Sequence, residues 1–211
     1  MNPVLLTQIA GLSLIAYILG SIPWGIILTR NISEDIRKTG SGNIGATNVR
    51  RIAGTRRGAL TLLGDMLKGA IPVWLVHLAG RPEICWPDDV VALVAVCAVL
   101  GHLYPVFLKF KQGGKGVATA AGCFLAISPL AFLIALVVFI AVIFRTNTMS
   151  AGSLSAIMVL PLALLLTSQP RVLSGCAVII MILITLRHKD NIKRLLNGTE
   201  PPIREKRNSD R

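Results

Sequence analysis

The sequence is short of charged and aromatic residues and has few cysteines. Of its 211 residues, 15% are charged and 5% are aromatic, whereas an ordinary soluble domain carries about 25% charged residues. Hydrophobic residues make up 53% of the chain, and its mean hydropathy is +0.67. This shortage of charge excludes an ordinary soluble domain and predicts an integral membrane protein.

The cysteines form no C-x-x-C pair: they are Cys85, Cys97, Cys123 and Cys176. Three of them lie within apolar runs, where cysteine behaves as a small apolar residue. The pattern shows neither a disulfide framework nor a metal site. We therefore expect no bound metal.

Long apolar runs are abundant. The clear ones cover residues 4–28, 59–79, 90–108, 151–168 and 171–186, and they approach the ~20 residues that cross a bilayer. The first has no basic n-region and no small-x-small cleavage site, which predicts a retained span rather than a signal peptide. A sixth run, residues 117–144, has Ser128-Pro129 near its middle, so its hydropathy fits one span or two short ones.

The distribution of basic residues favours two spans in that sixth run, because Lys and Arg collect on the cytoplasmic side. A turn at Pro129 leaves only Arg81 and Arg171 outside, of 22 basic residues. We predict an all-α, polytopic membrane helical bundle with seven transmembrane helices, its N-terminus outside and its C-terminus cytoplasmic. Residues 1–198 are expected to form one integral-membrane domain, and residues 199–211 a basic cytoplasmic tail.

The net charge of +12 fits this topology. On a polytopic protein, a basic excess marks the cytoplasmic side and contact with anionic lipid headgroups of the bilayer. No aromatic interleaving or binding motif accompanies the charge, so we expect no nucleic-acid partner.

Three polar segments interrupt the apolar runs, at residues 39–51, 109–116 and 187–191. The first reads T-G-S-G-N-I-G-A-T-N-V-R-R. Its polar and glycine residues suit an anion site, because glycine lets backbone amides approach a phosphate and guanidinium groups bind its oxygens. The candidates here are the glycines Gly40, Gly42 and Gly45, the polar residues Ser41, Asn43, Thr47 and Asn48, and the paired arginines Arg50 and Arg51.

The second segment is a glycine loop that leads into a helix at Val117. It contains Gly113, Gly114, Lys115 and Gly116. Free amides at a helix start and a lysine charge are the parts of a phosphate cradle. It is not a Walker A loop, since Lys109 stands where the first glycine belongs and Gly116 replaces the magnesium-binding Ser or Thr. The alternative is a flexible turn whose lysines only orient the protein in the membrane.

Ionisable residues also occur inside predicted spans, where they are usually functional or paired. Asp65 and Lys68, three residues apart, share one face of the second span. They form either an ion pair that fixes helix packing or a pair whose Lys68 also binds substrate. His102, near the inner end of the third span, is either a packing residue or a functional one.

The third segment reads L-R-H-K-D-N-I-K-R-L-L-N-G-T-E, and we expect the last span to continue into a short cytoplasmic helix. His188 and Asn191 would then share one face. Arg187 and Arg194 are expected to face lipid or phosphate. Glu200 is expected to anchor a basic loop through an ion pair.

Together, G-S-G-N-I-G-A-T-N-V-R-R, G-H-L-Y-P-V-F followed by G-G-K-G-V-A-T, and R-H-K-D-N-I-K-R-L resemble the motifs of the bacterial acyl-phosphate:glycerol-3-phosphate acyltransferase family. The resemblance covers nearly the whole chain. It implies transfer of a fatty acyl group from acyl phosphate to the sn-1 hydroxyl of glycerol 3-phosphate, giving lysophosphatidic acid and phosphate. It also implies a multi-pass protein of the bacterial inner membrane with a cytoplasmic active site. Because acyl phosphate is already activated, it implies no CoA and no other cofactor, and it implies an upstream acyl-carrier-protein:phosphate acyltransferase.

The resemblance also implies roles for residues at matching positions. Ser41, Arg51, Lys115, His188 and Asn191 correspond to catalytic groups. Substrate binding is implied for Gly40, Asn43, Asn48, Gly113, Gly114 and Gly116, with Lys68 added from its position, and a structural role is expected for Asp65, His102 and Glu200. The sequence departs from the family pattern at Gln112, an insertion that leaves the geometry of the loop open.

Two mechanisms and two other functions remain as alternatives. The glycerol hydroxyl attacks the acyl phosphate directly, with His188 as base or orienter, or Ser41 acts as a nucleophile. Common acyl-CoA-dependent enzymes place Asp five residues after a catalytic His, whereas this chain has Pro82, Phe107 and Lys193 five residues after its three histidines. A transporter of phosphorylated solutes is disfavoured, because no internal repeat or mid-membrane break is visible.

Overall fold

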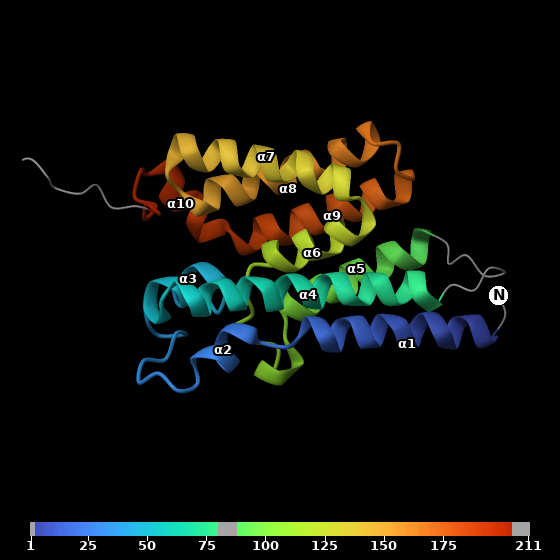
Figure 1. Ribbon diagram of the computed structural model, residues 1–211, viewed down its shortest axis with the longest axis horizontal. Coiled ribbons are helices and arrows are strands. Elements are labelled where there is room, and N and C mark those ends of the chain that lie inside the picture. The colour runs from blue at the N-terminus through green and yellow to red at the C-terminus, as the bar shows by residue number, and fades with distance from the viewer. Residues whose placement is uncertain (1–2, 80–87, 204–211) are drawn as a thin grey trace, which may run out of the picture.

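The structure is a computed structural model that describes residues 3–79 and 88–203. Within these residues it consists of helices and connecting loops, with no strand, which confirms the all-helical class. Most helices lie along one long axis (Figure 1). The elements are α1 (Pro3–Gly20), α2 (Trp24–Thr29), α3 (Ala46–Ala53), α4 (Thr55–Ala79), α5 (Asp88–Leu103), η1 (Val106–Leu108), α6 (Val117–Ile127), α7 (Pro129–Thr146), α8 (Met149–Leu166), α9 (Arg171–Arg187) and α10 (Lys189–Leu196). Arg81, Pro82, Cys85 and residues 204–211 lie outside the described residues.

Each predicted apolar run is a helix or a pair of helices. The first run divides into α1 and α2 at Ser21–Pro23, because a residue before proline is disfavoured in the α conformation. The break leaves the carbonyl of Ile22 outside a helical ladder, and Nζ of Lys68 donates a hydrogen bond to it at 2.8 Å. A lysine from α4 thus satisfies the broken turn of a neighbouring helix.

The run over residues 117–144 is divided, as predicted, at Ser128-Pro129. Ser128 caps the N-terminus of α7, its hydroxyl accepting a hydrogen bond from the amide of Ala131 at 3.4 Å. Pro129 occupies the first turn, where its missing N–H costs nothing. Five described segments are long and apolar enough to cross a membrane, the bent α9–α10 pair is a sixth candidate, and α6 is shorter at 11 residues.

Glycine residues bring the helices close together. A Cβ on Gly20 would lie 2.1 Å from the carbonyl oxygen of Ala98, and one on Gly101 would lie 2.2 Å from that of Tyr17. These two contacts join α1 and α5, and Gly69 and Gly122 make similar ones between α4 and α6. Small residues of this kind let membrane helices pack backbone to backbone.

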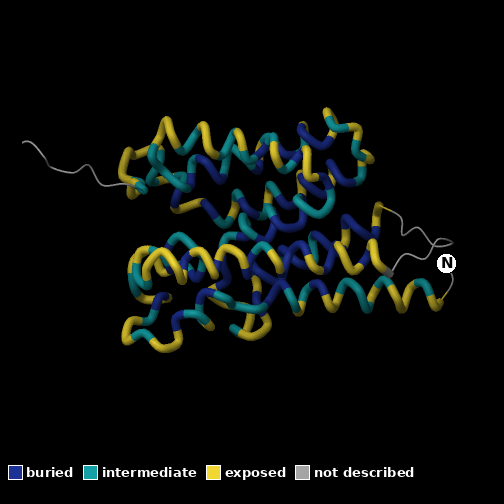
Figure 2. Tube along the Cα trace, in the orientation of Figure 1, coloured by how far each residue is buried: buried dark blue, intermediate teal, exposed yellow. Residues whose placement is uncertain are grey.

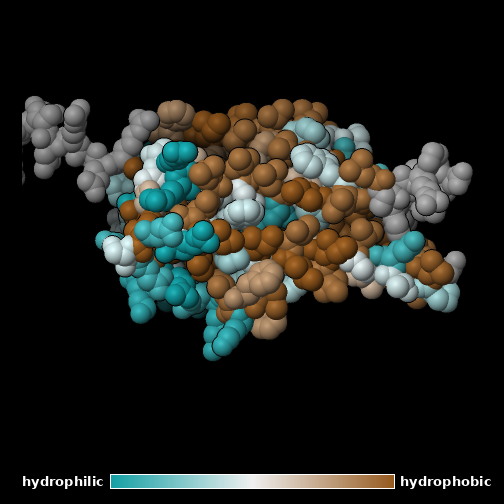
Figure 3. All heavy atoms as spheres, turned by 60° about the horizontal axis from the view of Figure 1, so that its bottom comes forward, coloured by the Kyte–Doolittle hydropathy of each residue, from teal (hydrophilic) through white to brown (hydrophobic). Residues whose placement is uncertain are grey.

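The buried residues lie between the helices, whereas outer faces such as that of α7 are exposed (Figure 2). Many exposed side chains are large and apolar, including Val137 at 66% and Phe144 at 81%. Figure 3 shows one face on which hydrophobic residues cover most of the length and hydrophilic ones gather at one end. That end, which we call the polar end, carries α3 and α10 (Figure 1). The glycine loop (residues 113–116) is joined to it by hydrogen bonds to Arg187 and Asn191.

Candidate active site

All three polar segments meet at the polar end. Nζ of Lys115 in the glycine loop donates a hydrogen bond to Oδ1 of Asn191 in α10. The guanidinium of Arg187, at the end of α9, donates to the carbonyl of Gly113 at 2.7 Å. Arg51 of α3 is close enough to Lys115 for its charge to disfavour the lysine's protonation.

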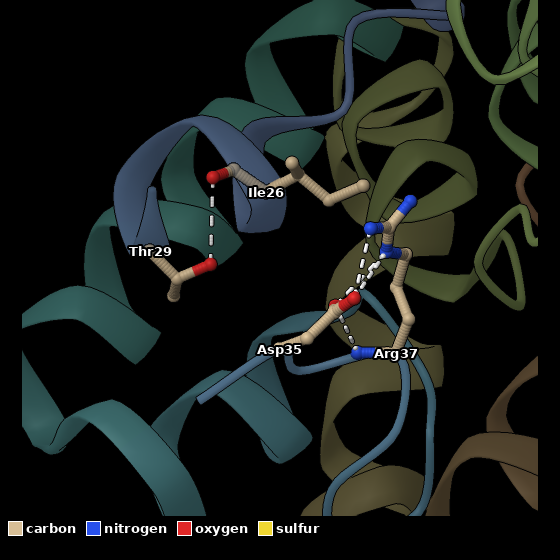
Figure 4. Close-up of polar contacts among 4 residues, drawn as sticks. All are labelled: Ile26, Thr29, Asp35 and Arg37. Carbon is tan, nitrogen blue, oxygen red and sulfur yellow. Dashed lines mark hydrogen bonds and ion pairs between the residues drawn. The ribbon is translucent and has the colours of Figure 1, made fainter. Parts of the chain in front are cut away.

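Local polar contacts occur at the end of α2 and in the loop that follows it (Figure 4). The hydroxyl of Thr29 donates to backbone carbonyls of its own helix, at 2.6 Å to Gly25 and 3.4 Å to Ile26. Farther on, Asp35 accepts hydrogen bonds from the backbone and guanidinium of Arg37. The side-chain bond from Arg37 lowers the pKa of Asp35 to about 2, so this pair is charged at neutral pH and closes a tight turn.

Asn48 holds the part of that loop which carries Ser41. Its Nδ2 donates to the carbonyls of Ile36 and Thr39 at 3.0 and 3.2 Å, and its Oδ1 accepts from the amide of Ser41 at 2.9 Å. Asn48 is only 2% exposed. The side-chain amide of Asn48 therefore positions the loop, and its contact with substrate stays a prediction.

Other residues of the first segment remain accessible. Ser41 and Arg51 are exposed. Asn43 is half-buried, and its Oδ1 accepts a hydrogen bond from the amide of Gly45 at 2.8 Å. Gly40 has φ +63°, and a Cβ there would lie 2.4 Å from Oδ1 of Asn48, so glycine is required by both backbone conformation and space.

The glycine loop packs tightly against the C-terminal end of α5. A Cβ on Gly113 would lie 2.0 Å from the carbonyl oxygen of Leu103, and one on Gly114 would lie 2.0 Å from Nε2 of His102. The amide of Gly114 donates to the carbonyl of His102 at 3.2 Å. Gly114 therefore does not offer the free amide expected of a phosphate cradle. Gly116, at φ +88°, starts α6.

Gln112, where the sequence departs from the family pattern, lies in a turn with a strained backbone. Lys109, Phe110 and Gln112 have φ values of 53°, 61° and 56°, which side chains other than glycine adopt rarely. The turn carries Gln112 and Lys111 on the exposed surface while Gly113 and Gly114 are buried. With Gln112 present, Gly113 and Gly114 still pack against the end of α5.

Lys115 is the partly buried cation at the centre of the polar end. Burial is the main cause that lowers its pKa to about 8, with Glu200 opposing the shift and Arg194 and Arg51 adding to it. Binding of a phosphate would stabilise the charged form of this lysine, because the phosphate supplies a negative charge beside the partly buried ammonium group.

His188 and Asn191 stand at the bend between α9 and α10, which turns the chain by 66°. They are 2% and 6% exposed. Nδ1 of His188 lies 2.8 Å from the carbonyl of Ile184, so this nitrogen carries the proton and Nε2 keeps its lone pair. Burial lowers the pKa of His188 to about 4, which makes the ring neutral at pH 7.

Glu200 joins two residues of α10, as an anchoring residue should. Its Oε1 accepts from Nδ2 of Asn191 at 2.7 Å and its Oε2 from Nε of Arg194 at 2.8 Å. The predicted ion pair is confirmed. Burial raises the pKa of Glu200, but the contacts with Asn191, Ser150 and Arg194 and the positive charge of Arg194 together bring the pKa below its usual value. The amide of Ile203 then donates to the carbonyl of Asn147 at 2.8 Å, which holds the chain to the α7–α8 turn.

Asp65, Lys68 and His102 form a buried cluster behind the glycine loop. Nζ of Lys68 lies 2.9 Å from Oδ1 of Asp65, and Nδ1 of His102 lies 3.6 Å from the same oxygen. The predicted ion pair is confirmed. Lys68 is 4% exposed and already bonded to Asp65 and to Ile22, which favours a role in helix packing, while substrate binding by Lys68 stays a prediction.

Sequence reasoning missed the contact made by Arg187. This residue does not face lipid: its guanidinium bonds to the carbonyls of Gly113 and Gly114 and lies 5.8 Å from the ring centre of Tyr104. No sequence pattern indicates these partners, because two are backbone carbonyls more than 70 residues away.

The fold and the site define a helical membrane protein whose partly buried cations gather at one end of an apolar bundle. A family model described as glycerol-3-phosphate acyltransferase matches residues 10–198. The chain therefore belongs to the glycerol-3-phosphate acyltransferase family.

Individual relatives agree with this assignment. The glycerol-3-phosphate acyltransferases of Geotalea daltonii and Geobacter sulfurreducens are 48% and 47% identical to the chain, over 88% and 90% of its length and 92% and 94% of theirs. The crystal structure of PlsY (YgiH), an integral membrane glycerol 3-phosphate acyltransferase, in its glycerol 3-phosphate form has a TM-score of 0.86 and 37% identity. It covers 92% of this chain and 95% of that one. The lysophosphatidic acid form of PlsY has a TM-score of 0.84 and 36% identity, with the same coverage.

Proposed function

We propose that the protein transfers a fatty acyl group from acyl phosphate to the sn-1 hydroxyl of glycerol 3-phosphate, releasing lysophosphatidic acid and phosphate. The observation that carries this proposal is the meeting of Lys115, Arg51 and Asn191 at one end of an apolar bundle. Both substrates are anions, and the donor has a fatty chain, so a cationic site beside an apolar surface suits both. The glycerol 3-phosphate and lysophosphatidic acid forms of PlsY support the same acceptor and product.

In this proposal the cations hold two phosphate groups side by side. Lys115 and Arg51 bind the phosphate oxygens, and Asn43 and Ser41 orient the acyl phosphate through polar contacts. An acyl phosphate is a mixed anhydride and is already activated. The protein therefore contributes proximity and stabilisation of the oxyanion that forms at the acyl carbon.

The glycerol hydroxyl attacks the acyl carbon, the bond to the phosphate oxygen breaks, and phosphate leaves with the electron pair. Nε2 of His188 is available to accept a hydrogen bond from this hydroxyl, since Nδ1 is hydrogen-bonded to the carbonyl of Ile184. Its pKa of about 4 makes it a weak base, so its main contribution is orientation, and a phosphate oxygen takes up the proton. Ser41 is less suited to be a nucleophile, because its hydrogen bond runs through its backbone amide to Asn48 and not to a base.

The same proposal includes seven spans. Successive long helices alternate in direction (Figure 1), and adding α6 and α9 to the five long apolar segments makes seven. With α6 only ~16 Å long, the bilayer beside it would be thinned or its ends covered by protein. In this proposal the polar end faces the cytoplasm from a bacterial inner membrane, which the excess of basic residues supports. An acyl-carrier-protein:phosphate acyltransferase would supply the donor.

The test is acyl transfer by the purified protein in lipid, with labelled glycerol 3-phosphate and either acyl phosphate or acyl-CoA. We expect lysophosphatidic acid from acyl phosphate alone, and a loss of at least ~100-fold in kcat/KM for Arg51→Ala. Arg56→Ala is the matched control, because Arg56 is exposed at the start of α4; it should retain activity. Product from acyl-CoA alone would refute acyl phosphate as the donor. Acylated Ser41 trapped during turnover would refute direct attack by the glycerol hydroxyl.

A further inference from the structure

We infer that Arg187 is a positioning residue that holds the glycine loop in the conformation needed for phosphate binding. The inference rests on the proposed function, since it assigns a role to a residue beside that site. Arg187 itself does not contact the reacting atoms. It acts through the backbone that carries Lys115.

The guanidinium of Arg187 binds two consecutive carbonyls of the loop. Nη2 donates to Gly113 at 2.7 Å and Nε donates to Gly114 at 3.3 Å. The fork geometry of arginine permits this double contact, whereas the single ammonium of lysine is a point donor. One side chain thereby fixes the direction of two neighbouring peptide planes.

The guanidinium is itself held in place. It lies 5.8 Å from the ring centre of Tyr104, within the range of a cation–π contact. The backbone carbonyl of Tyr104 accepts a hydrogen bond from the hydroxyl of Tyr17 at 2.6 Å. Helix α1 is thus connected, through Tyr104 and Arg187, to the glycine loop.

The peptide between Gly113 and Gly114 is bound on both edges. Arg187 binds its carbonyl, while its N–H donates to the carbonyl of His102 at 3.2 Å. The ring of His102 fills the space where a side chain on Gly114 would lie. This peptide has no freedom to rotate without breaking at least one of these bonds.

The next peptide is bound on one edge only. Arg187 binds the carbonyl of Gly114, and in a trans peptide the N–H of Lys115 points the opposite way. Within residues 88–203 and 3–79, that N–H donates to no backbone carbonyl. Arg187 therefore turns the amide of Lys115 away from itself and leaves it available to an anion, beside the Nζ of the same residue.

A competing explanation is that Arg187 matters only as a positive charge that attracts anionic substrates. Lys189 separates the two explanations, because it lies two residues away, is exposed and begins α10. Lys189→Gln removes one charge at nearly the same place without touching the glycine loop. Arg187→Lys keeps the charge and removes the fork.

The experiment measures kcat and KM of these two variants and the wild type in lipid, together with hydrogen exchange of the segment 109–117. For Arg187→Lys we expect a rise of ~10-fold or more in KM for glycerol 3-phosphate or acyl phosphate, and faster exchange confined to that segment, because charge-assisted bonds are lost. Lys189→Gln should change both quantities less than twofold. Added methylguanidine should partly restore Arg187→Ala and leave Lys189→Gln unchanged.

Wild-type KM and wild-type exchange in Arg187→Lys would overturn the inference. An equal loss of activity in Lys189→Gln would replace it with the charge explanation. If Arg187→Lys fails to fold, Tyr104→Leu, which leaves the arginine but removes the ring beside it, must show the same local rise in exchange. A wild-type protein without acyl-phosphate activity would refute the proposed function, whereas the exchange data would still decide whether Arg187 holds the loop.

Discussion

Lys115 and Asn191 are 76 residues apart in the sequence, and Nζ of the lysine donates a hydrogen bond to Oδ1 of the asparagine. Asn191 in turn donates to Glu200. The position of the partly buried lysine therefore depends on α10 and a C-terminal segment, which follow four further helices in the sequence.

Replacing Lys115 by methionine should reduce kcat/KM by ~100-fold or more, because the variant removes a charge placed to bind phosphate. The measurement is steady-state acyl transfer in lipid. Lys111→Met is the matched control, since Lys111 precedes the same loop and is exposed. Equal activity of the two variants would contradict the central role of Lys115.

The activity should fall as the pH rises through about 8. Burial lowers the pKa of Lys115 to about 8, and lysine loses its charge above its pKa. Lys115→Arg keeps a charge throughout this range, so whatever activity it retains should lack that alkaline decline. Plots of kcat/KM against pH for both proteins provide the check, and a decline at the same pH in both would assign it to another group.

The stability of the protein should fall as the pH drops from 6.5 towards 4. Burial lowers the pKa of His188 to about 4, so between these values the unfolded state binds a proton that the native state does not. Stability therefore rises with pH across this window, by roughly 3 kcal/mol in total. Thermal unfolding in detergent should show that His188→Gln loses this part of the pH dependence. The idea fails if the wild type and the variant shift in parallel.

Removing only one partner of the ion pair between Asp65 and Lys68 should lower the stability of the protein. Lys68→Met leaves a buried carboxylate without its partner and should lower stability by about 3–5 kcal/mol. Asp65→Leu with Lys68→Met should cost less than either single change, because no lone charge remains. Thermal midpoints of the three variants measure the coupling, and additive losses would show that the pair is not interdependent.

Two glycines of α1 should respond in opposite ways to alanine. A Cβ on Gly20 would lie 2.1 Å from the carbonyl oxygen of Ala98, whereas Gly11 has nothing within 4 Å. Gly20→Ala should therefore cost about 1–3 kcal/mol by overpacking α1 against α5. Gly11→Ala should be neutral or slightly stabilising, since alanine favours helix more than glycine does. Unfolding midpoints that rank the variants in the other order would refute this packing.

Much of the fold was predictable from local sequence. Apolar runs of sufficient length must form helices in a bilayer, because backbone groups there have no other partners. The break at Ser128-Pro129 follows from the chemistry of a capping serine and a first-turn proline. The pairing of Asp65 with Lys68 was also predictable from local sequence, because residues three apart lie on one face of a helix.

The candidate site was only partly predictable. The amino-acid types identified Ser41, Arg51, Lys115, His188, Asn191 and Glu200 as candidates. They did not reveal that the side chain of Asn48 hydrogen-bonds to its own loop or that Lys68 bonds to Ile22 and Asp65. Nor did they reveal that Arg187 bonds to the glycine loop. These residues have the same chemistry as substrate ligands, and only their hydrogen-bond partners distinguish them.

The sequence by itself determined the class of the protein, the apolar runs that become most of its helices and the three polar segments, because these depend on hydropathy, proline and glycine along the chain. The tertiary structure alone decided which polar groups remain available at the polar end. The partners that occupy Asn48, Lys68 and Arg187 include backbone carbonyls, and every residue has a carbonyl. A pattern of side chains cannot specify such a contact; it arises only when distant segments are packed together.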